Sequence, residues 1–145
     1  MNVNSRNTLA QNWLEKAKKR YAAAEMLYNS DMIGDAATKL YYAVYSTLRA
    51  LLTVDDIAAK DGKSIVKHST LISQFNKNYI HEKKVFPVAY TAYIKKTEEL
   101  RIDEDYGDMV PIQKEIVQSY LEKFPEFYTS LSNYVIAQIN EQKKV

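Results

Sequence analysis

The sequence predicts an all-α protein, an antiparallel up-and-down bundle of about five helices that forms a single domain over residues 1–145. Three observations indicate this fold. Apolar residues recur at steps of three and four along most of the chain, which is the spacing of one helix face. Only 3 glycines and 3 prolines occur, so long segments run without a break. Hydrophobic residues make up 46% of the chain, enough to form a core at this length.

Two long helices are predicted over residues 9–29 and 32–54. The residues that mark their apolar faces are Trp13, Ala17, Tyr21, Ala24 and Tyr28, and then Ala37, Leu40, Tyr41, Val44, Leu48 and Leu51. Asp31 is expected to cap the second helix. Because the second helix is apolar over a wide arc, we expect it to be central in the bundle. The same arc and the aromatic content of 12% predict a homodimer, since aromatic residues are enriched at interface cores.

A charged loop over residues 55–67 separates these helices from the next two. A short helix is predicted from about Ser69 to Asn78. Another is expected to start near Pro87, because proline is tolerated in a first turn, and to continue to about Asp105.

The last predicted helix opens at Pro111, after Gly107, which suits the end of the preceding helix. Apolar residues continue at helical spacing from Ile112 to Tyr134. Pro125 lies inside this pattern and should kink the helix or split it.

Composition excludes several classes of protein. The chain has no cysteine, so it has no disulfide and no thiol chemistry. No stretch approaches the ~18–20 apolar residues that span a bilayer, and the polar N-terminus predicts no signal peptide, so a cytoplasmic protein is expected. Scattered glycines exclude a phosphate-binding loop, and His68 and His81 are far apart, so neither a cofactor nor a metal is predicted.

The densest polar cluster surrounds Arg101 with six carboxylates between Glu98 and Asp108. Glu98 and Asp105 stand three residues before and four residues after Arg101, which is the spacing of helix ion pairs. The alternatives are a divalent-metal site formed by the carboxylates and an anion site at Arg101, since a guanidinium matches phosphate geometry.

Aromatic and basic residues supply the other candidates. Tyr41 and Tyr42 are either core side chains or a stacking surface for a base. His68, beside Lys67 at a helix start, is either structural or an anion-binding or proton-transfer residue. The basic run 16–20 is either a solvated helix face or a contact to a nucleic-acid backbone.

Taken in order, these segments resemble the HEPN domain family (higher eukaryote and prokaryote nucleotide-binding) over roughly residues 12–132. The matching segments are Trp13–Ala17, the small-residue run Ala22–Leu27, Asp35–Tyr45 with its Tyr-Tyr-Ala, Lys67-His68-Ser69 followed by Phe75, and Arg101 with Asp105-Tyr106 in an Arg-x3-Asp-Tyr pattern. The resemblance implies a helical bundle that usually dimerises. It also implies, for many prokaryotic members, a small nucleotidyltransferase partner in toxin–antitoxin or defence systems.

Active toxins of this family are metal-independent ribonucleases that use an Arg and a His separated by four to six residues. Counting from Arg101, that His position falls on Tyr106, Gly107 and Asp108. Tyrosine, with a pKa near ~10, is a poor proton acceptor at neutral pH. Arg101 therefore matches the arginine of the family's catalytic pair, whereas the sequence has no histidine at the position of the general base.

The sequence thus favours a non-catalytic module that binds a nucleotide, RNA or a nucleotidyltransferase partner. The alternatives are a ribonuclease toxin with a rearranged site and a structural partner without a ligand. The candidate ligand-binding residues are Arg101, Asp105, Tyr106, His68, Lys67, Tyr41 and Tyr42, and the catalytic candidates are Arg101 and His68. We predict that the protein lacks efficient ribonuclease activity.

Overall fold

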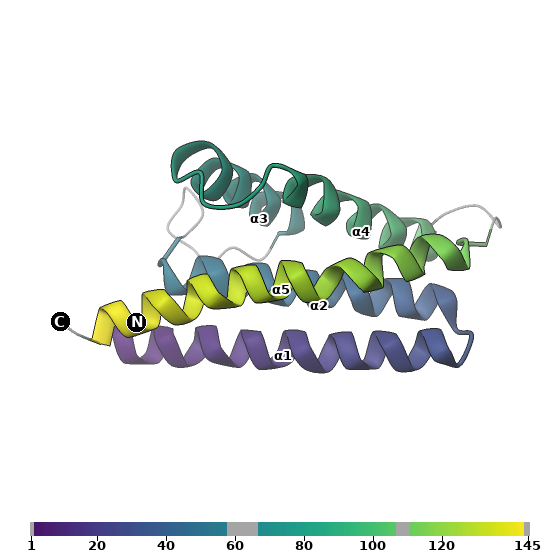
Figure 1. Ribbon diagram of the computed structural model, residues 1–145, viewed down its shortest axis with the longest axis horizontal. Coiled ribbons are helices and arrows are strands. Elements are labelled where there is room, and N and C mark those ends of the chain that lie inside the picture. Colours follow the sequence, from purple (N-terminus) through teal and green to yellow (C-terminus); the bar gives the residue numbers. More distant parts are fainter. Residues whose placement is uncertain (1, 58–66, 107–110, 144–145) are drawn as a thin grey trace.

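The helical elements account for nearly all of the residues that the computed structural model describes, which are 2–57, 67–106 and 111–143, without the side chains of Asp105 and Tyr106. These elements are α1 (Val3–Asn29), α2 (Ile33–Val54), α3 (His68–Phe75), the π-helix η1 (Asn76–Glu82), α4 (Ala89–Tyr106) and α5 (Lys114–Lys143). No strand occurs in those ranges, and the all-α prediction is confirmed. The helices α1, α2 and α5 run side by side, and α3 and α4 lie on the other side of α2 from α1 (Figure 1). None of the described helices is long and apolar enough to cross a membrane.

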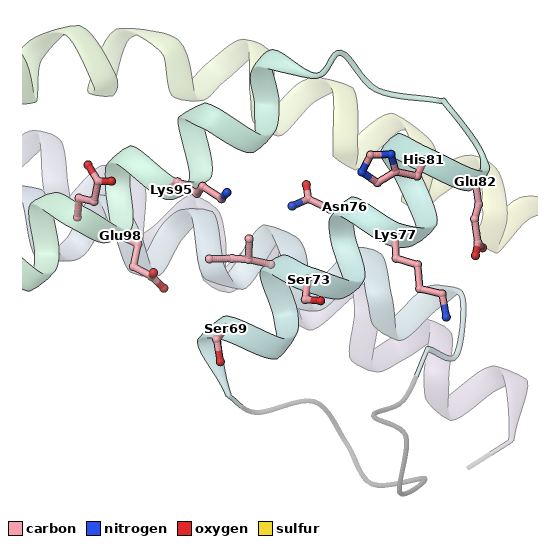
Figure 2. A pocket seen from close by; sticks show the side chains of 10 residues that line it. Ser69, Ser73, Asn76, Lys77, His81, Glu82, Lys95 and Glu98 are labelled. Atoms are coloured by element: carbon pink, nitrogen blue, oxygen red, sulfur yellow. The ribbon is translucent and has the colours of Figure 1, made fainter.

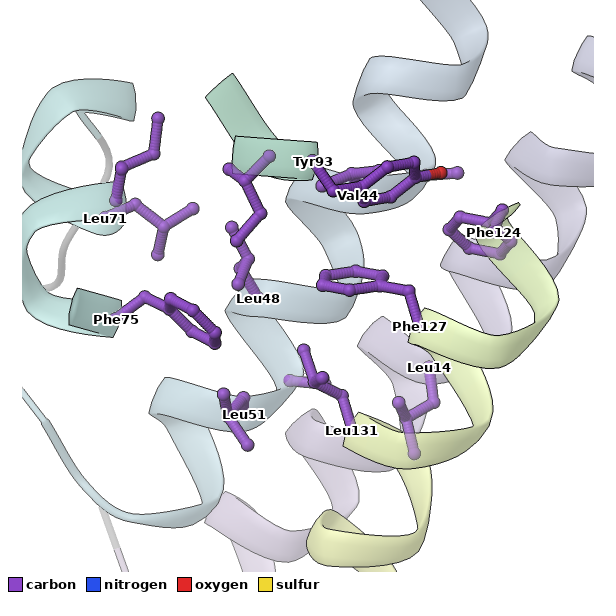
Figure 3. Packing of buried hydrophobic residues seen from close by; sticks show 14 of the residues in the cluster. Leu14, Val44, Leu48, Leu51, Leu71, Phe75, Tyr93, Phe124, Phe127 and Leu131 are labelled. Atoms are coloured by element: carbon purple, nitrogen blue, oxygen red, sulfur yellow. The ribbon is translucent and has the colours of Figure 1, made fainter. Parts of the chain in front are cut away.

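The helix α2 is the centre of the bundle, as its wide apolar arc predicted, and it packs against α1, α3, α4 and α5. Figure 3 shows its side chains meeting those of α3 and α5 in the core. The labelled contacts of this core include Val44, Leu48, Leu51, Leu71, Phe75, Phe127 and Leu131. Because helices of the same chain cover the arc, the arc gives no argument for a dimer.

The turn between α1 and α2 corrects one prediction, since Asp31 does not cap α2. The cap position is Met32, which makes no side-chain cap bond, and Asp31 has a φ of 64°. The Met32 amide donates to Leu27 and the Asp31 amide to Tyr28, at 2.9 and 3.0 Å. This is the Schellman arrangement, so Asp31 ends α1 in the left-handed conformation that aspartate tolerates, instead of starting α2.

Other helix ends also differ from the predicted ones. The first helix begins at Val3 instead of residue 9, because the Asn2 side chain accepts a hydrogen bond from the Ser5 amide at 2.8 Å and caps it. The third helix begins at His68 and continues past Phe75 as η1, with no proline or glycine to stop it before Pro87. The fourth begins two residues after Pro87 and the last three residues after Pro111. Gly107 lies outside the described residues.

Pro125 does not split the last helix, because α5 is continuous from Lys114 to Lys143. Proline has no N–H, so the carbonyl of Leu121 four residues earlier loses its helix partner. The Tyr21 hydroxyl of α1 donates to that carbonyl at 2.8 Å, and the Tyr21 ring stacks on Phe124 at 4.5 Å. A side chain of α1 therefore replaces the hydrogen bond that Pro125 removes.

Gly34 allows the C-terminal half of α4 to approach the start of α2. A Cβ atom at Gly34 would lie 2.2 Å from the Glu104 carboxyl group. The glycine thus leaves room for a carboxylate at the first turn of α2, where the helix dipole favours negative charge. Arg101 lies one turn before Glu104, so the same approach brings Arg101 toward α2.

Candidate functional site

Tyr41 on α2 is the centre of a cluster that three helices form. Its side chain is only 1% exposed, because α2 is surrounded by the rest of the bundle. The Tyr41 hydroxyl forms a hydrogen bond with Nδ1 of His68, the first residue of α3. It also donates to Oε2 of Glu98 on α4 at 3.3 Å. A buried phenol thereby links α2, α3 and α4.

The single proton of the Tyr41 hydroxyl determines which nitrogen of His68 carries a proton. Burial, followed by the charge and hydrogen bond of Glu98, raises the pKa of Tyr41 far above its usual range, so the phenol keeps its proton. The Tyr41 hydroxyl can donate that proton either to Nδ1 of His68, so that Nε2 carries the proton of the imidazole, or to Glu98. In the second arrangement the Nδ1–H of a neutral His68 donates to the Tyr41 oxygen. The lone pair of the imidazole then lies on Nε2.

His68 is held in its neutral form. Burial lowers its pKa, the positive charge of Arg101 lowers it further, and the Glu98 carboxylate raises it in opposition. The result is a pKa below the usual 6.5, so His68 is unprotonated at pH 7. A neutral imidazole can accept a hydrogen bond or a proton.

Arg101 approaches the same tyrosine from α4. Its guanidinium lies over the Tyr41 ring, 5.3 Å from the ring centre, and the side chain is half-buried. A cation held over an aromatic face is restrained without losing its charge. Arg101 is thus a fixed positive charge close to a neutral His68.

Aromatic rings enclose His68 on the α2 side. Its imidazole stacks on Tyr45 and on Tyr41, with ring centres 4.8 and 5.2 Å apart, and meets the edge of Tyr42 at 6.2 Å. Tyr41 and Tyr45 lie one turn apart on α2, and Tyr42 directly follows Tyr41. These contacts fix the orientation of the imidazole ring.

The fold therefore brings together four of the predicted site residues, namely His68, Arg101, Tyr41 and Tyr42. Tyr41 cannot stack on a base, because it is buried. Its ring instead stacks on the imidazole of His68. Lys67 is exposed and precedes α3 without a side-chain cap bond. Asp105 and Tyr106 lie in the last turn of α4, and their side chains are outside the described residues.

Three participants were not predicted. Glu98 was expected to form an ion pair with Arg101, but in the structure it accepts the Tyr41 hydrogen bond. Tyr45 was considered, like Tyr41 and Tyr42, as a core side chain or part of a stacking surface, and it was not among the candidate site residues. Arg49, which donates to the Tyr45 hydroxyl at 2.9 Å, was not considered, although Tyr42, Tyr45 and Arg49 share a helical spacing of three and four that would have indicated one face.

A cavity of about 710 Å³ adjoins this cluster between α3, η1 and α4. Figure 2 shows Lys95 and Asn76 pointing toward each other across it, with Ser69 and Glu98 at the end nearest the cluster. Its charged lining residues are Lys77, Lys95, Glu82, Glu98 and Glu99, together with His81. Three carboxylates outnumber two lysines, so the cavity itself does not favour a phosphate.

The family follows from comparison with known sequences. The sequence pattern of the HEPN domain matches residues 10–134. The chain belongs to the HEPN domain family. A "putative toxin" of Methanocaldococcus jannaschii is 30% identical over 125 residues, which cover 86% of this HEPN chain and 80% of the relative.

Two further relatives of this HEPN protein are similar over most of their length. A "UPF0332 protein" of Thermotoga maritima is 24% identical over 133 residues, 92% of this chain and 96% of that protein. A second "putative toxin" of M. jannaschii is 28% identical over 102 residues, 70% of this chain and 71% of that protein. The comparisons support a toxin-like HEPN module.

Proposed function

We propose that this HEPN protein is a toxin-type module that binds the backbone of RNA at His68 and Arg101. The observation that carries the proposal is that α3 and α4 bring these two side chains against the same buried tyrosine, Tyr41. The sequence separates them by more than thirty positions, so only the fold joins them.

The chemistry of the two groups suits RNA. The Arg101 guanidinium offers several N–H donors in a planar fork that matches a phosphate. The Nε2 lone pair of neutral His68 can accept a hydrogen bond from a ribose 2′-hydroxyl, the group that distinguishes RNA from DNA. One positive donor group beside one neutral acceptor therefore fits a phosphate next to a 2′-hydroxyl.

Cleavage of the bound RNA is a second candidate function, favoured by the tautomer in which Tyr41 donates to Glu98 and Nε2 of His68 is unprotonated. In this reaction the 2′-oxygen attacks phosphorus, its proton moves to Nε2, and the bond to the 5′-oxygen breaks as that oxygen takes a proton from solvent. Arg101 would stabilise the charge on the phosphorane. His68 would then fill, from α3, the role of the histidine that is absent at the family spacing after Arg101.

Binding is tested by fluorescence anisotropy in EDTA, with an unmodified RNA hexamer and the DNA hexamer of the same sequence. Arg101→Gln should weaken RNA binding on the order of fivefold at 0.1 M salt, the loss of one phosphate contact. His68→Phe keeps the ring stacking but lacks Nε2, so it should abolish the preference for RNA over DNA. Lys96→Gln on α4 and His81→Gln are the matched controls. Equal RNA affinity in Arg101→Gln, His68→Phe and the controls would refute the proposal.

Cleavage is tested by incubating the same RNA with wild type and both variants and analysing the ends. The second candidate function requires 2′,3′-cyclic phosphate products that disappear in Arg101→Gln and in His68→Phe and persist in His81→Gln. Bound RNA that stays intact across pH 6–9 would restrict the protein to binding, as the sequence predicted.

Two partner proposals accompany this function. A second copy of the chain and a small nucleotidyltransferase are the partners that the family resemblance implies. Light scattering at micromolar concentration tests the first. Co-purification with a nucleotidyltransferase encoded beside this chain tests the second, and a monomer that retains none would remove both.

A further inference from the structure

Three of the four arginines in the chain surround His68 through the tyrosines that it contacts. Arg101 lies over Tyr41, as described above. The Arg20 guanidinium of α1 lies 5.6 Å from the centre of the Tyr42 ring. The Arg49 guanidinium of α2 lies 5.8 Å from that of Tyr45. Each ring is in turn a neighbour of the His68 imidazole, so each guanidinium is one ring away from it.

Arg20 and Arg49 are held in place by neutral groups. One terminal nitrogen of Arg20 donates to the Ser46 hydroxyl and, at 3.4 Å, to the Tyr42 carbonyl. One terminal nitrogen of Arg49 donates to the Tyr45 hydroxyl at 2.9 Å, and the guanidinium also lies 4.7 Å from the Trp13 ring centre. These contacts restrain both side chains and do not neutralise them.

Both guanidiniums keep donors for a further partner. A guanidinium has five N–H groups, and in the part of the chain that the structure describes only one nitrogen of each is bonded. Among the same residues, no carboxylate oxygen lies within 4 Å of a nitrogen of either arginine. The cavity beside α4 differs in this respect, because carboxylates dominate its lining.

We propose that Arg20 and Arg49 bind the phosphates on either side of the one held at His68 and Arg101, so that the site takes a single RNA strand with at least three consecutive phosphates. The inference rests on the proposed function and extends it from one phosphate to a strand. Each of the three guanidiniums is separated from the His68 imidazole by one tyrosine ring, so the positive charges are spread around it. Separate charges suit the successive phosphates of a strand better than the closely spaced phosphates of a mononucleotide. The exposed Lys16, 4.9 Å from the Trp13 ring centre, continues the positive surface beyond Arg49.

The test compares two probes that differ in their number of phosphates, a uridine hexamer with unmodified 2′-hydroxyls and the dinucleotide UpU, which has one phosphodiester. Arg20→Gln and Arg49→Gln should each weaken the hexamer on the order of fivefold at 0.1 M salt. Each should also reduce the slope of log K against log salt by about 0.7, the value for one contact to a single strand. Neither should change the affinity for UpU by more than the exposed Lys19→Gln control next to Arg20 does.

The charge-retaining variants Arg20→Lys and Arg49→Lys keep the salt slope of the wild type if the arginines neutralise phosphates. They also guard against a folding defect, which circular dichroism melts would reveal in the glutamine variants. If the lysine variants lose as much slope as the glutamine variants, the arginines act by packing and the proposal is wrong.

The two proposals fail in different ways. Suppose that Arg101→Gln weakens the binding of both probes while Arg20→Gln and Arg49→Gln bind the hexamer like Lys19→Gln. The proposed contacts of Arg20 and Arg49 to a strand are then refuted, and the phosphate site at His68 and Arg101 stands. If Arg101→Gln changes neither probe, the proposed function itself is refuted.

Discussion

At the scale of single residues, the environment of His68 is defined by two opposite charges and one hydroxyl. Arg101 lowers the pKa of His68 and Glu98 raises it, after burial has lowered it first. Tyr41 contributes no charge, and its hydroxyl forms hydrogen bonds with both His68 and Glu98. The balance between these groups is measurable because the two charges can be removed separately.

We expect opposite shifts when either charge is removed. Arg101→Gln should raise the pKa of His68 toward 6.5, and Glu98→Gln should lower it further, because each variant deletes one of two opposing interactions. NMR titration of the imidazole protons measures both shifts, with Lys96→Gln as the control. Shifts of the same sign would contradict the described geometry.

The same pKa has a consequence for stability. Because the pKa of His68 is lower in the folded than in the unfolded chain, its contribution to stability is present above the unfolded value of about 6.5 and is lost as pH falls through the folded value. Acidification should therefore destabilise the wild type more than His68→Phe.

At this scale the sequence placed Arg101 with His68 and Lys67 in an expected anion site, whereas the role of Tyr41 between them could not be predicted. Helical spacing shows which residues share a face of one helix, but His68 and Arg101 meet across three helices. Arg20 was grouped with its lysine neighbours in a run expected to be either a solvated helix face or a contact to a nucleic-acid backbone. It differs from them because it reaches Tyr42 and Ser46 of α2, a contact that depends on how α1 and α2 are aligned.

At the scale of elements, the continuity of α5 through Pro125 depends on a side chain of α1. The Tyr21 hydroxyl bonds the carbonyl that the proline leaves without its helix partner. The sequence predicted a kink or a split because periodicity describes one helix in isolation. The compensating hydrogen bond comes from a residue one hundred positions away.

A double-mutant cycle measures this compensation. Tyr21→Phe should lower the free energy of unfolding by about 1 kcal/mol. In a Pro125→Ala background it should cost less, because the new amide of residue 125 can bond the Leu121 carbonyl. Tyr93→Phe is the control, since its hydroxyl donates to the Tyr120 carbonyl, which proline does not affect. Equal losses for Tyr21→Phe in both backgrounds would show that the hydroxyl does not replace the missing bond.

At the scale of the whole molecule, one carboxylate at the end of α2 joins this helix to two other elements. Asp55, at the end of α2, accepts hydrogen bonds from Tyr79 of η1 and Tyr134 of α5, both at 2.7 Å, and pairs with Lys83 at 3.4 Å. Its side chain is 10% exposed. Burial, followed by the interactions with Asp55, raises the pKa of both phenols above the usual range, so both hydroxyls keep their protons and remain donors.

We expect Asp55→Ala to lower the free energy of unfolding by about 3 kcal/mol, because it removes two hydrogen bonds to a charged acceptor from a mostly buried position. Asp56→Ala is the control, since Asp56 is 77% exposed and its ion pair with Arg6 should contribute less than about 1 kcal/mol. Chemical denaturation measures both. A loss at Asp55 no larger than that at Asp56 would contradict the role of this carboxylate.

The sequence predicted the central place of α2 and the number of long helices, because apolar periodicity extends over whole elements. It did not predict what covers the wide arc of α2. The arc was assigned partly to a second copy of the chain, whereas in the structure α2 packs against α1, α3, α4 and α5. An apolar arc records how much of a helix is buried and not which chain buries it.

Trp13 gives this molecule an intrinsic optical reporter. It is the single tryptophan of the chain, and it lies between the cations of Arg49 and Lys16 and against the edge of Tyr45. Indole emission depends on nearby charge, so a strand that draws Arg49 toward a phosphate should alter the fluorescence intensity. Excitation at the red edge of the indole band does not excite the 12 tyrosines. Occupancy of the surface around Arg49 can thus be followed in the unlabelled protein.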